Sequence, residues 1–543
     1  MKTKIVTALT GFALLFLGCQ PKPTSIDLIV YNAEMVTVDE AIPYAQAMAI
    51  DQGQIIAIGS TKALLQKFKP NQAIDLEGKT VLPGLIDAHT HLYALGLAMQ
   101  QVDLVGTRSK DEVIERLRSF EPYKNANYIV ARGWDQNDWE DPTYPSKQDL
   151  DAYFPDTPVA LSRVDGHALW VNSAALDLAE ITADLVMEGG SVLIENGAPS
   201  GILIDTPCEK IFETIPSPSR AEKINALLQA QEVCFSFGLT TVNEAGLDRQ
   251  IIELIDSLQQ ADIMQLKVYA MAENTPKNRA YYFAKGPYKT PRLNVRSIKV
   301  YGDGALGSRG AALRQPYWDQ PHHFGAMITD ESALMTIAQS AFDAGFQMNT
   351  HAIGDSANVS VLRVYEKVLA QQKDMRWKIE HAQVIPPTYF SFFSNNIIPS
   401  VQPTHATSDM YWAEERLGPV RILGAYAYKS LLEHSGIIAL GTDFPVEKVN
   451  PMLTFYAAVA RQDLDQFPEN GFMPEQMLSR MDALKGMTIW AAYSNFEEAE
   501  KGSLSVGKSA DFIVLDQNPL TCSVANIPKI QVLKTYSQGQ QVY

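Results

Sequence analysis

The chain has 543 residues, more than one ordinary domain needs, although a barrel with insertions can exceed 400 residues. A hydrophobic fraction of 46% is normal for a globular protein with a large core and argues against disorder. The formal net charge of −17 argues against nucleic acid or an anionic membrane surface as a partner.

The first 19 residues are predicted to be a lipoprotein-type signal peptide. Lys2 and Lys4 give a positive start, and the apolar run that follows is too short to span a bilayer as a mature helix. Cys19 closes this run and is the candidate for lipidation, although Phe16 stands three positions earlier where Leu is usual. An ordinary secretory signal with a chance cysteine and an uncleaved anchor are the alternatives. We therefore expect a protein of the bacterial cell envelope, held at the membrane by a lipid anchor on Cys19 and folded outside the cytoplasm.

Both ends of the remaining chain are rich in strand patterns. Residues 20–26 are interpreted as a tether, and residues 27–80 alternate apolar and polar positions around a hairpin signal at Gly53. Residues 493–543 form a second strand-rich segment. The residues alone predict two β-rich ends without showing that they pair.

The middle of the chain, residues 81–492, alternates strand-like runs with helical patterns. Apolar spacing predicts helices over 251–260, 333–344 and 359–371. Roughly 140 residues separate the first strand of this region from the run GLTTVNEAG, far more than one strand–helix–strand connection requires. The stretch of about 97–225 is therefore predicted to be an inserted subdomain, and its aromatic and polar content suits a cover over a substrate site.

Five apolar runs in this region end in residues of metal-binding type. In parallel barrels the carboxyl ends of the strands meet at one mouth, where the chemistry is placed. The pattern therefore predicts an α/β protein, a (β/α)8 TIM-type barrel with a two-metal hydrolytic centre. The candidate ligands, in chain order, are His89, His91, Lys299, His351, His381 and Asp443.

The segments PGLIDAHTHL, KVYGDGALGSRGAAL, HAIGD, IEHAQ and LGTDFPVEKVNP occur in this order. Together they resemble the amidohydrolase superfamily, most closely its amidohydrolase-3 branch, which includes N-substituted formamide deformylase-like proteins. The resemblance runs from about residue 26 to residue 543. It implies a small β-sandwich built from both chain ends, and it implies that the inserted subdomain lies over the barrel mouth.

The residue types of the predicted centre suit divalent metals. His89 and His91 are two apart on a strand end, so both side chains point to one side and one cation can take both. Neutral imidazole suits zinc and other first-row metals. A protonated lysine cannot be a ligand, but the resemblance implies that Lys299 is carboxylated by carbon dioxide and bridges two metal ions, most simply zinc. The alternative is a lysine that pairs with Asp303 or Glu380 and only fixes the pocket.

Two residues are predicted to move or stabilise charge during the reaction. Asp443 is the candidate general base, which orients the activated water, accepts its proton and delivers it to the leaving nitrogen. His167, in DGHALWVN, is the candidate donor to the substrate carbonyl or the developing oxyanion. A capping aspartate and a packed histidine are the respective alternatives.

Other residues are candidates for positioning ligands or binding substrate. Asp303 and Glu380 would orient the metal ligands. Arg309 and Arg421 could bind a carboxylate or orient the cover, with surface ion pairs as the alternative. Among the histidines without an assigned role, His405 in QPTHAT is the one expected to approach the site. Trp134 could line an apolar pocket, with aromatic packing within the insertion as the favoured alternative.

The predicted function is hydrolysis of a C–N bond in a small-molecule linear or cyclic amide. Cys208, Cys234 and Cys522 form neither a disulfide framework nor a metal pair and supply no nucleophile. A related barrel hydrolase of esters, lactones or carbamates is the alternative, and a non-catalytic ligand-binding lipoprotein is the alternative of another class. A homo-oligomer is compatible with the sequence.

Overall fold

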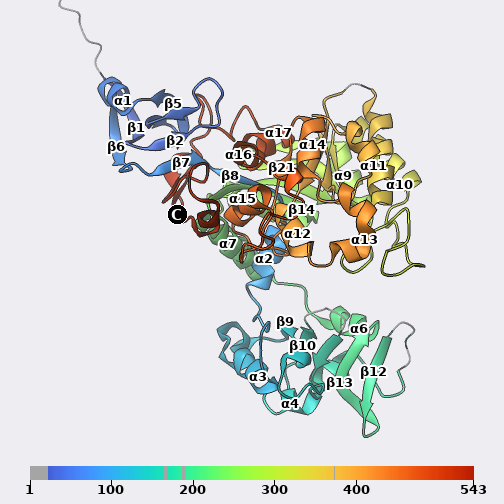
Figure 1. The fold of residues 1–543 in the computed structure, drawn as a ribbon. Coiled ribbons are helices and arrows are strands. Elements are labelled where there is room, and N and C mark those ends of the chain that lie inside the picture. The colour runs from blue at the N-terminus through green and yellow to red at the C-terminus, as the bar shows by residue number, and fades with distance from the viewer. Residues whose placement is uncertain (1–22, 164–167, 186, 188–189, 372) are drawn as a thin grey trace, which may run out of the picture.

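The computed structural model describes residues 23–163, 168–185, 187, 190–371 and 373–543 (Figure 1). Two predicted functional residues, Cys19 and His167, lie outside the described residues. Among the described residues, no helix is both long enough and apolar enough to cross a membrane.

The centre of the molecule is a ring of eight parallel strands, which confirms the predicted (β/α)8 barrel. Neighbours in the ring follow the order of the chain. A short strand, β16 (Tyr288–Lys289), pairs with one member from outside the ring. The ring strands are β8 (Leu85–Thr90), β14 (Leu239–Leu247), β15 (Lys267–Glu273), β17 (Leu293–Tyr301), β18 (Gln347–Ala352), β19 (Trp377–His381), β20 (Ile397–Val401) and β21 (Ala439–Leu440).

The ring closes between its first and last strands. The Asp443 N–H donates to the His89 carbonyl at 2.9 Å, and the His91 N–H donates to the Phe444 carbonyl at 2.8 Å. Gly441 makes this approach possible, because a Cβ at its position would lie 2.6 Å from the backbone nitrogen of His89. The seam therefore places the last predicted ligand directly beside the first.

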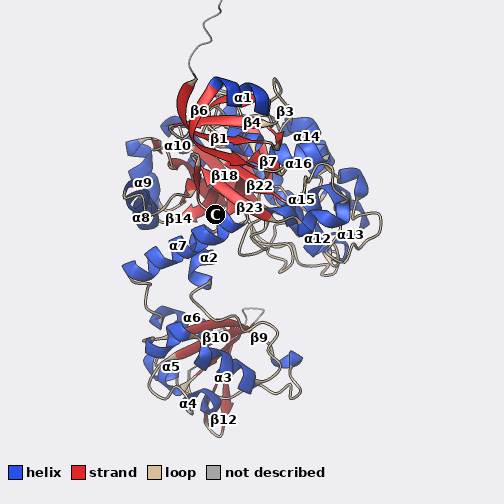
Figure 2. Cartoon of the chain, turned by 90° about the vertical axis from the view of Figure 1, so that its left-hand side faces the viewer, coloured by secondary structure: helices blue, strands red, loops and turns tan. Residues whose placement is uncertain are grey.

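Helices surround the ring (Figure 2). Their apolar side chains belong to the same buried core as those of the ring strands. The three predicted helices are confirmed as α8 (Arg249–Gln260), α10 (Glu331–Ala344) and α11 (Asp355–Leu369). In α10, Asp330 accepts from the Ala333 N–H and Gly345 ends the helix in a left-handed conformation. The other helices around the ring are α2 (Leu92–Ala98), α7 (Arg220–Ser236), α9 (Pro276–Lys285), α12 (Pro403–Asp409), α13 (Ala413–Arg421), α14 (Tyr428–Ser435), α15 (Pro451–Ala460), α16 (Arg480–Gly486) and α17 (Ile489–Ser494).

Both chain ends build a small β-sandwich beside the barrel (Figure 1). One sheet contains only amino-terminal strands, and the second combines strands from both ends. The first has the order β5 (Gln54–Gly59), β4 (Ala47–Asp51), β1 (Thr24–Tyr31), β6 (Phe68–Asp75), with α1 (Thr61–Lys67) between β5 and β6 in the chain. The second has the order β24 (Gln540–Gln541), β23 (Val532–Ser537), β22 (Phe512–Leu515), β7 (Thr80–Pro83), β2 (Glu34–Val36), β3 (Tyr44–Ala45).

Two boundaries differ from those expected. The first sheet begins at Thr24, so the last part of the predicted tether is already a strand, because Ile26 is buried in the sandwich. The barrel does not begin at Val81, since β7 pairs with β2 and β22 of the sandwich. Gly84 separates β7 from the first ring strand, and an apolar run shared by two sheets hides such a boundary in the sequence.

The insertion forms a lobe with its own sheet and core. We call residues 102–215 the inserted lobe. Two hydrophobic clusters fill it, and all their described members belong to the lobe. Its sheet has the order β12 (Gly190–Glu195), β13 (Ala198–Asp205), β11 (Ala168–Val171), β10 (Val159–Arg163), β9 (Ile129–Trp134), and its helices are α3 (Lys110–Ser119), α4 (Lys147–Asp151), α5 (Ser173–Leu178) and α6 (Pro207–Thr214).

The lobe stands apart from the barrel in both views and is joined to it by the segments that follow α2 and precede α7 (Figures 1 and 2). These two helices pack closely, because Gly96 leaves room for the Ala226 carbonyl, which a Cβ would approach to 2.0 Å. The root of the lobe is therefore firmly packed. That the lobe covers the barrel mouth stays a prediction.

Candidate metal centre

The structure brings all six predicted ligands to the carboxyl end of the barrel. Each lies within the last three residues of a ring strand or just after one, as the sequence pattern predicts. The strand-to-residue assignment is His89 in β8, His91 just after it, Lys299 in β17, His351 in β18, His381 in β19 and Asp443 after β21.

Three of these residues form the tightest group. Ligand atoms of His89, His381 and Asp443 all lie within 4.8 Å of one another, and all three side chains are buried. The His89 and His381 ring centres are 4.9 Å apart. Two imidazoles and a carboxylate at this spacing are a donor set that a single divalent ion can use.

The other three surround this group. His91 Nε2 lies 3.2 Å from Asp443 Oδ1, and Lys299 Nζ lies 3.0 Å from His89 Nε2. The His351 ring centre is 4.5 Å from that of His381. Lys299 Nζ therefore points at His89 Nε2, among the candidate imidazole ligands. A protonated lysine at this place would repel a metal cation.

Two of the ligands have unusual backbone conformations. His381 has a φ of 72° and Asp443 a φ of 63°, a left-handed region that non-glycine residues rarely adopt. In an extended strand, Glu380 and His381 would point to opposite faces. The turn at His381 brings its side chain to the site as well. Strained conformations of this kind concentrate at functional sites.

Burial keeps the imidazoles neutral. Burial and, to a lesser extent, the charge of Lys299 together lower the pKa of His89 to about 4 and that of His351 to about 3. Burial also lowers the pKa of Lys299 to about 8, against the raising effect of Glu380 and Asp443. A neutral imidazole is the form that binds a metal.

Asp443 has the opposite balance. Burial raises its pKa, but the hydrogen bond with His91 and the electrostatic interactions with His89, His381 and His405 outweigh burial and hold the pKa well below its usual range. Asp443 is therefore a carboxylate at neutral pH. This is the state that a ligand or a general base requires.

Buried polar groups orient the ligands from behind. His89 Nδ1 donates to Glu380 Oε2 at 2.6 Å, and His381 Nδ1 donates to Gln402 Oε1 at 2.7 Å. Asp303 accepts the N–H groups of Ile353 and Gly354 at 3.0 and 2.7 Å and so holds the loop after β18. Such partners fix the tautomer and the ring orientation of metal-binding histidines.

These features fit a divalent metal. The donor atoms are neutral imidazole nitrogens and an ionised carboxylate, and His89 and His381 each have the second ring nitrogen anchored. This donor set is of the type that zinc and other first-row divalent metals bind.

The remaining predicted residues lie at different distances from this centre. His405 belongs to it, because its Nε2 lies 3.7 Å from Asp443 Oδ2 and its ring stacks on His381. Arg309 pairs with Asp319 at 2.6 Å, and Arg421 donates to backbone carbonyls, as in Arg421 Nη1 to Gln315 at 2.8 Å.

Trp134 lies inside the inserted lobe, where its indole donates to the Leu161 carbonyl at 2.8 Å. Its ring packs against Trp139 and Trp170. This placement agrees with the alternative of core packing.

Several residues of the centre were not singled out from the sequence. Gln402 follows the run IIPSV, so the same strand-end pattern could have identified it. Glu244, near the end of β14, accepts from the Leu92 and Tyr93 N–H groups just after His91. Asp87 accepts from the Thr442 N–H at 3.0 Å and its hydroxyl at 2.7 Å, which holds the seam beside Asp443. These two have no sequence signal beyond an acidic residue in an apolar run.

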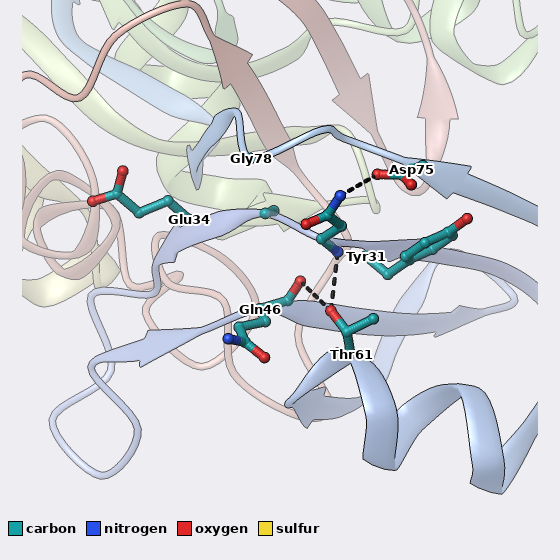
Figure 3. A pocket seen from close by; sticks show the side chains of 8 residues that line it. Tyr31, Glu34, Gln46, Thr61, Asp75 and Gly78 are labelled. Carbon is teal, nitrogen blue, oxygen red and sulfur yellow. Dashed lines mark hydrogen bonds between the residues drawn. The ribbon is translucent and has the colours of Figure 1, made fainter.

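A hollow of about 500 Å³ lies elsewhere, on the terminal β-sandwich (Figure 3). Asn32 donates to Asp75 Oδ1 at 2.7 Å on its wall, and Thr61 accepts from the Asn32 N–H. Its lining includes none of the six candidate ligands. The chemistry of the barrel mouth therefore does not extend to it.

Comparison with known proteins adds independent evidence. A model of the amidohydrolase family matches residues 72–543. Protein LONG AFTER FAR-RED 3 of Arabidopsis thaliana is 34% identical over 95% of this chain and 91% of its own length. N-substituted formamide deformylase of Arthrobacter pascens is 25% identical over 94% of this chain and 97% of its own length. An uncharacterized metal-dependent hydrolase from Pyrococcus horikoshii OT3 is 26% identical and has a TM-score of 0.79, covering 92% of this chain and 99% of that chain.

A closed (β/α)8 barrel with imidazoles and a carboxylate at its carboxyl mouth defines a class, the barrel hydrolases with a candidate metal site. Within this class, the chain belongs to the amidohydrolase family, since the family model covers the whole barrel and the carboxyl-terminal strands of the sandwich. The predicted resemblance is thereby confirmed.

Proposed function

We propose that the chain is a metal-dependent amidohydrolase that cleaves a C–N bond in a small linear or cyclic amide. The observation that carries this proposal is the convergence of His89, His381 and Asp443 within 4.8 Å at the barrel mouth. Similarity to a formamide deformylase over nearly the whole chain supports an amide as the substrate class.

The proposed cofactor is a pair of divalent ions, most simply zinc. His89, His91, His351, His381 and Asp443 would hold them, and a carboxylated Lys299 would bridge them. The neutral Lys299 amine would attack carbon dioxide, form an N–C bond and release one proton, which converts a neutral amine into an anionic carbamate. Burial lowers the pKa of Lys299 to about 8, so a fraction of the molecules carries the neutral amine near neutral pH. When bound, divalent ions lower the pKa of water from 15.7 to about 7 and polarise the scissile carbonyl.

The residues of the chain then move the proton. Asp443 accepts it from the attacking water and delivers it to the leaving nitrogen. Its held backbone and its low pKa suit this role. His405 Nε2 has no hydrogen-bond partner among the described residues, so it is available to donate to the substrate oxygen. His167 is proposed for the same task from the sequence motif.

Metal content per chain tests the proposal first, on protein that starts at Gln20 and is purified without chelator. Two ions and a carbamate carbon signal after ¹³C-bicarbonate labelling would support the bridging Lys299. One ion without that signal would make Lys299 structural. No metal after reconstitution would overturn the proposed function.

Paired amide and ester substrates with the same acyl group test the bond that is cleaved. Turnover of the amide supports the proposal. Turnover confined to the ester, lactone or carbamate member would move the assignment to a related barrel hydrolase.

We also propose the bacterial cell envelope as the location, with a lipid on Cys19. This rests on the signal-like sequence of the first 19 residues. Metabolic labelling with a fatty acid should mark the wild-type protein and spare a Cys19→Ser variant. Equal labelling of both would contradict the proposal.

A further inference from the structure

The interior of the barrel beneath the candidate ligands contains a fully buried lysine. Lys378 lies in the middle of β19, and its side chain is 0% exposed. Barrel interiors are usually filled by branched apolar side chains. Strand register places Lys378 beside Asn349, which in turn neighbours Lys299, so the inward positions at this level are polar.

Lys378 is paired with Glu380, whose two carboxylate oxygens have different partners. Lys378 Nζ lies 3.6 Å from Glu380 Oε1, and the other oxygen, Oε2, accepts from His89 Nδ1 at 2.6 Å. Lys378 Nζ has no hydrogen-bond partner among the described residues, and its other neighbour is the Tyr269 ring, with the ring centre 5.1 Å away. Lys378, Glu380 and His89 therefore form a continuous chain that ends at a metal-binding nitrogen.

The two ends of His89 have different tasks. Its Nδ1 is bound to Glu380, while its Nε2 faces Lys299 and Asp443 at 3.0 and 3.6 Å. The hydrogen bond at Nδ1 selects the tautomer that presents a lone pair at Nε2. Glu380 is therefore the group that keeps His89 in its ligating form.

A carboxylate without exposure to water needs a compensating charge. Both Glu380 and Lys378 are 0% exposed. Removing one partner of a buried pair is strongly destabilising, because it leaves the remaining charge poorly compensated. The position of Glu380 against His89 thus depends on Lys378.

We propose that Lys378 is a positioning residue of the metal centre, which acts through Glu380 to hold His89 for metal binding. The Lys378 ammonium makes no hydrogen bond to any of the six candidate ligands, all of which the structure describes, and its ion pair is with Glu380. This inference rests on the proposed function in requiring a metal at His89, but it does not depend on which bond the enzyme cleaves.

The test is the zinc dissociation constant of the full mature chain, measured after chelator treatment by competition with a chromophoric zinc ligand. Loss of a partner behind a metal ligand costs roughly 10- to 100-fold in affinity, so Lys378→Met should raise the Kd of zinc by that factor. Lys378→Gln serves if the methionine variant does not fold. An unchanged Kd in the folded variant would overturn the inference.

Lys267→Met is the matched control. Lys267 is also fully buried in a barrel strand and ion-paired, with its Nζ 2.5 Å from Asp511 Oδ1, but that pair lies on the sandwich side of the barrel. This variant should lose stability and keep the zinc Kd of the wild type. An equal loss of affinity in both variants would make Lys378 merely structural and overturn the inference.

A double-mutant cycle tests the route of action. If Lys378 acts through Glu380, then Lys378→Met combined with Glu380→Gln should bind zinc as Glu380→Gln alone does. Losses that multiply would contradict the inference. If wild-type protein binds no zinc, the proposed function fails as well. If it binds zinc but hydrolyses no amide, only the substrate assignment fails.

Discussion

Asp443 combines three properties at the scale of a single residue. It has a left-handed backbone, a carboxylate held in its charged form and contacts with His89, His91 and His405. An asparagine at this position would keep the shape of the side chain but could neither accept a proton nor carry the negative charge.

Asp443→Asn should lower kcat on the best amide substrate by roughly 10²- to 10⁴-fold, as expected for loss of a general base. Metal content must be measured in the same samples, so that loss of an ion is separated from loss of the base. Asp262→Asn is the control. Asp262 is exposed, follows α8 in the chain and forms an ion pair with Arg292. A metal-loaded Asp443→Asn protein with wild-type kcat would rule out the proposed role.

His351 links the centre to the pH dependence of stability. Its pKa falls from 6.5 to about 3 on folding, because of burial and the charge of Lys299. Between these values the unfolded chain binds a proton at His351 that the folded chain does not, so this residue makes stability fall as the pH drops. The full contribution is present above about pH 6.5 and is lost on acidification towards about pH 3.

His351→Asn should therefore gain stability relative to wild type as the pH is lowered through this window. The measurement is the denaturant midpoint of both metal-free proteins at several pH values, with equal m-values required. Parallel pH curves for the two proteins would contradict the assigned shift.

The closing strand of the ring sets the geometry of the centre at the scale of the elements. Gly441 lies where β21 approaches β8, and a Cβ there would be 2.9 Å from Asp87 Oδ1 as well as 2.6 Å from the His89 nitrogen. A side chain of any size must push the two strands apart. Asp443, two residues later, would then move away from His89.

Gly441→Ala should destabilise the fold by about 1–3 kcal/mol, the usual cost of overpacking, and should weaken zinc binding. Gly59→Ala is the control, because a Cβ added at Gly59 would meet no heavy atom within 4 Å. Thermal unfolding and zinc titration of both variants check this. Wild-type zinc affinity in Gly441→Ala would show that the seam does not govern the centre.

Sequence patterns predict the ring and its ligands because each ligand stands at the end of an apolar run. They do not predict that His381 and Glu380 both reach inward, since strand alternation forbids it and only the left-handed backbone at His381 allows it. The pairing of Lys378 with Glu380 depends on burial, which a lysine in a strand pattern does not reveal. The predicted start of the barrel is wrong because β7 and β8 form one apolar run that two sheets divide.

The whole molecule contains more than one hydrophobic core. The inserted lobe has its own clusters around Trp134 and Leu203, and the barrel core has a separate one. Units with separate cores open independently. Metal at the barrel mouth should therefore stabilise the barrel and leave the lobe unaffected.

Calorimetry should accordingly show two transitions, of which only one moves to lower temperature after metal removal by a chelator. Three of the seven tryptophans, Trp134, Trp139 and Trp170, lie in the lobe, so the change in fluorescence across each transition helps to assign it. Trp170→Ala should lower the unmoved transition, because truncating a buried aromatic costs about 3–5 kcal/mol. A single transition that shifts as a whole would show that the lobe and the barrel unfold together.

The seam of the barrel also dictates the order of events during synthesis. Asp87 and Thr442, which bond across it, are 355 residues apart in the chain. Domains fold as units while the chain leaves the ribosome, and contacts this distant close late. The inserted lobe can fold long before Asp443 has been made, whereas the ring cannot close without its last strand. The nascent chain consequently carries a finished lobe on an open barrel from about residue 215 until residue 443 has been made, and it acquires its metal site only late in translation.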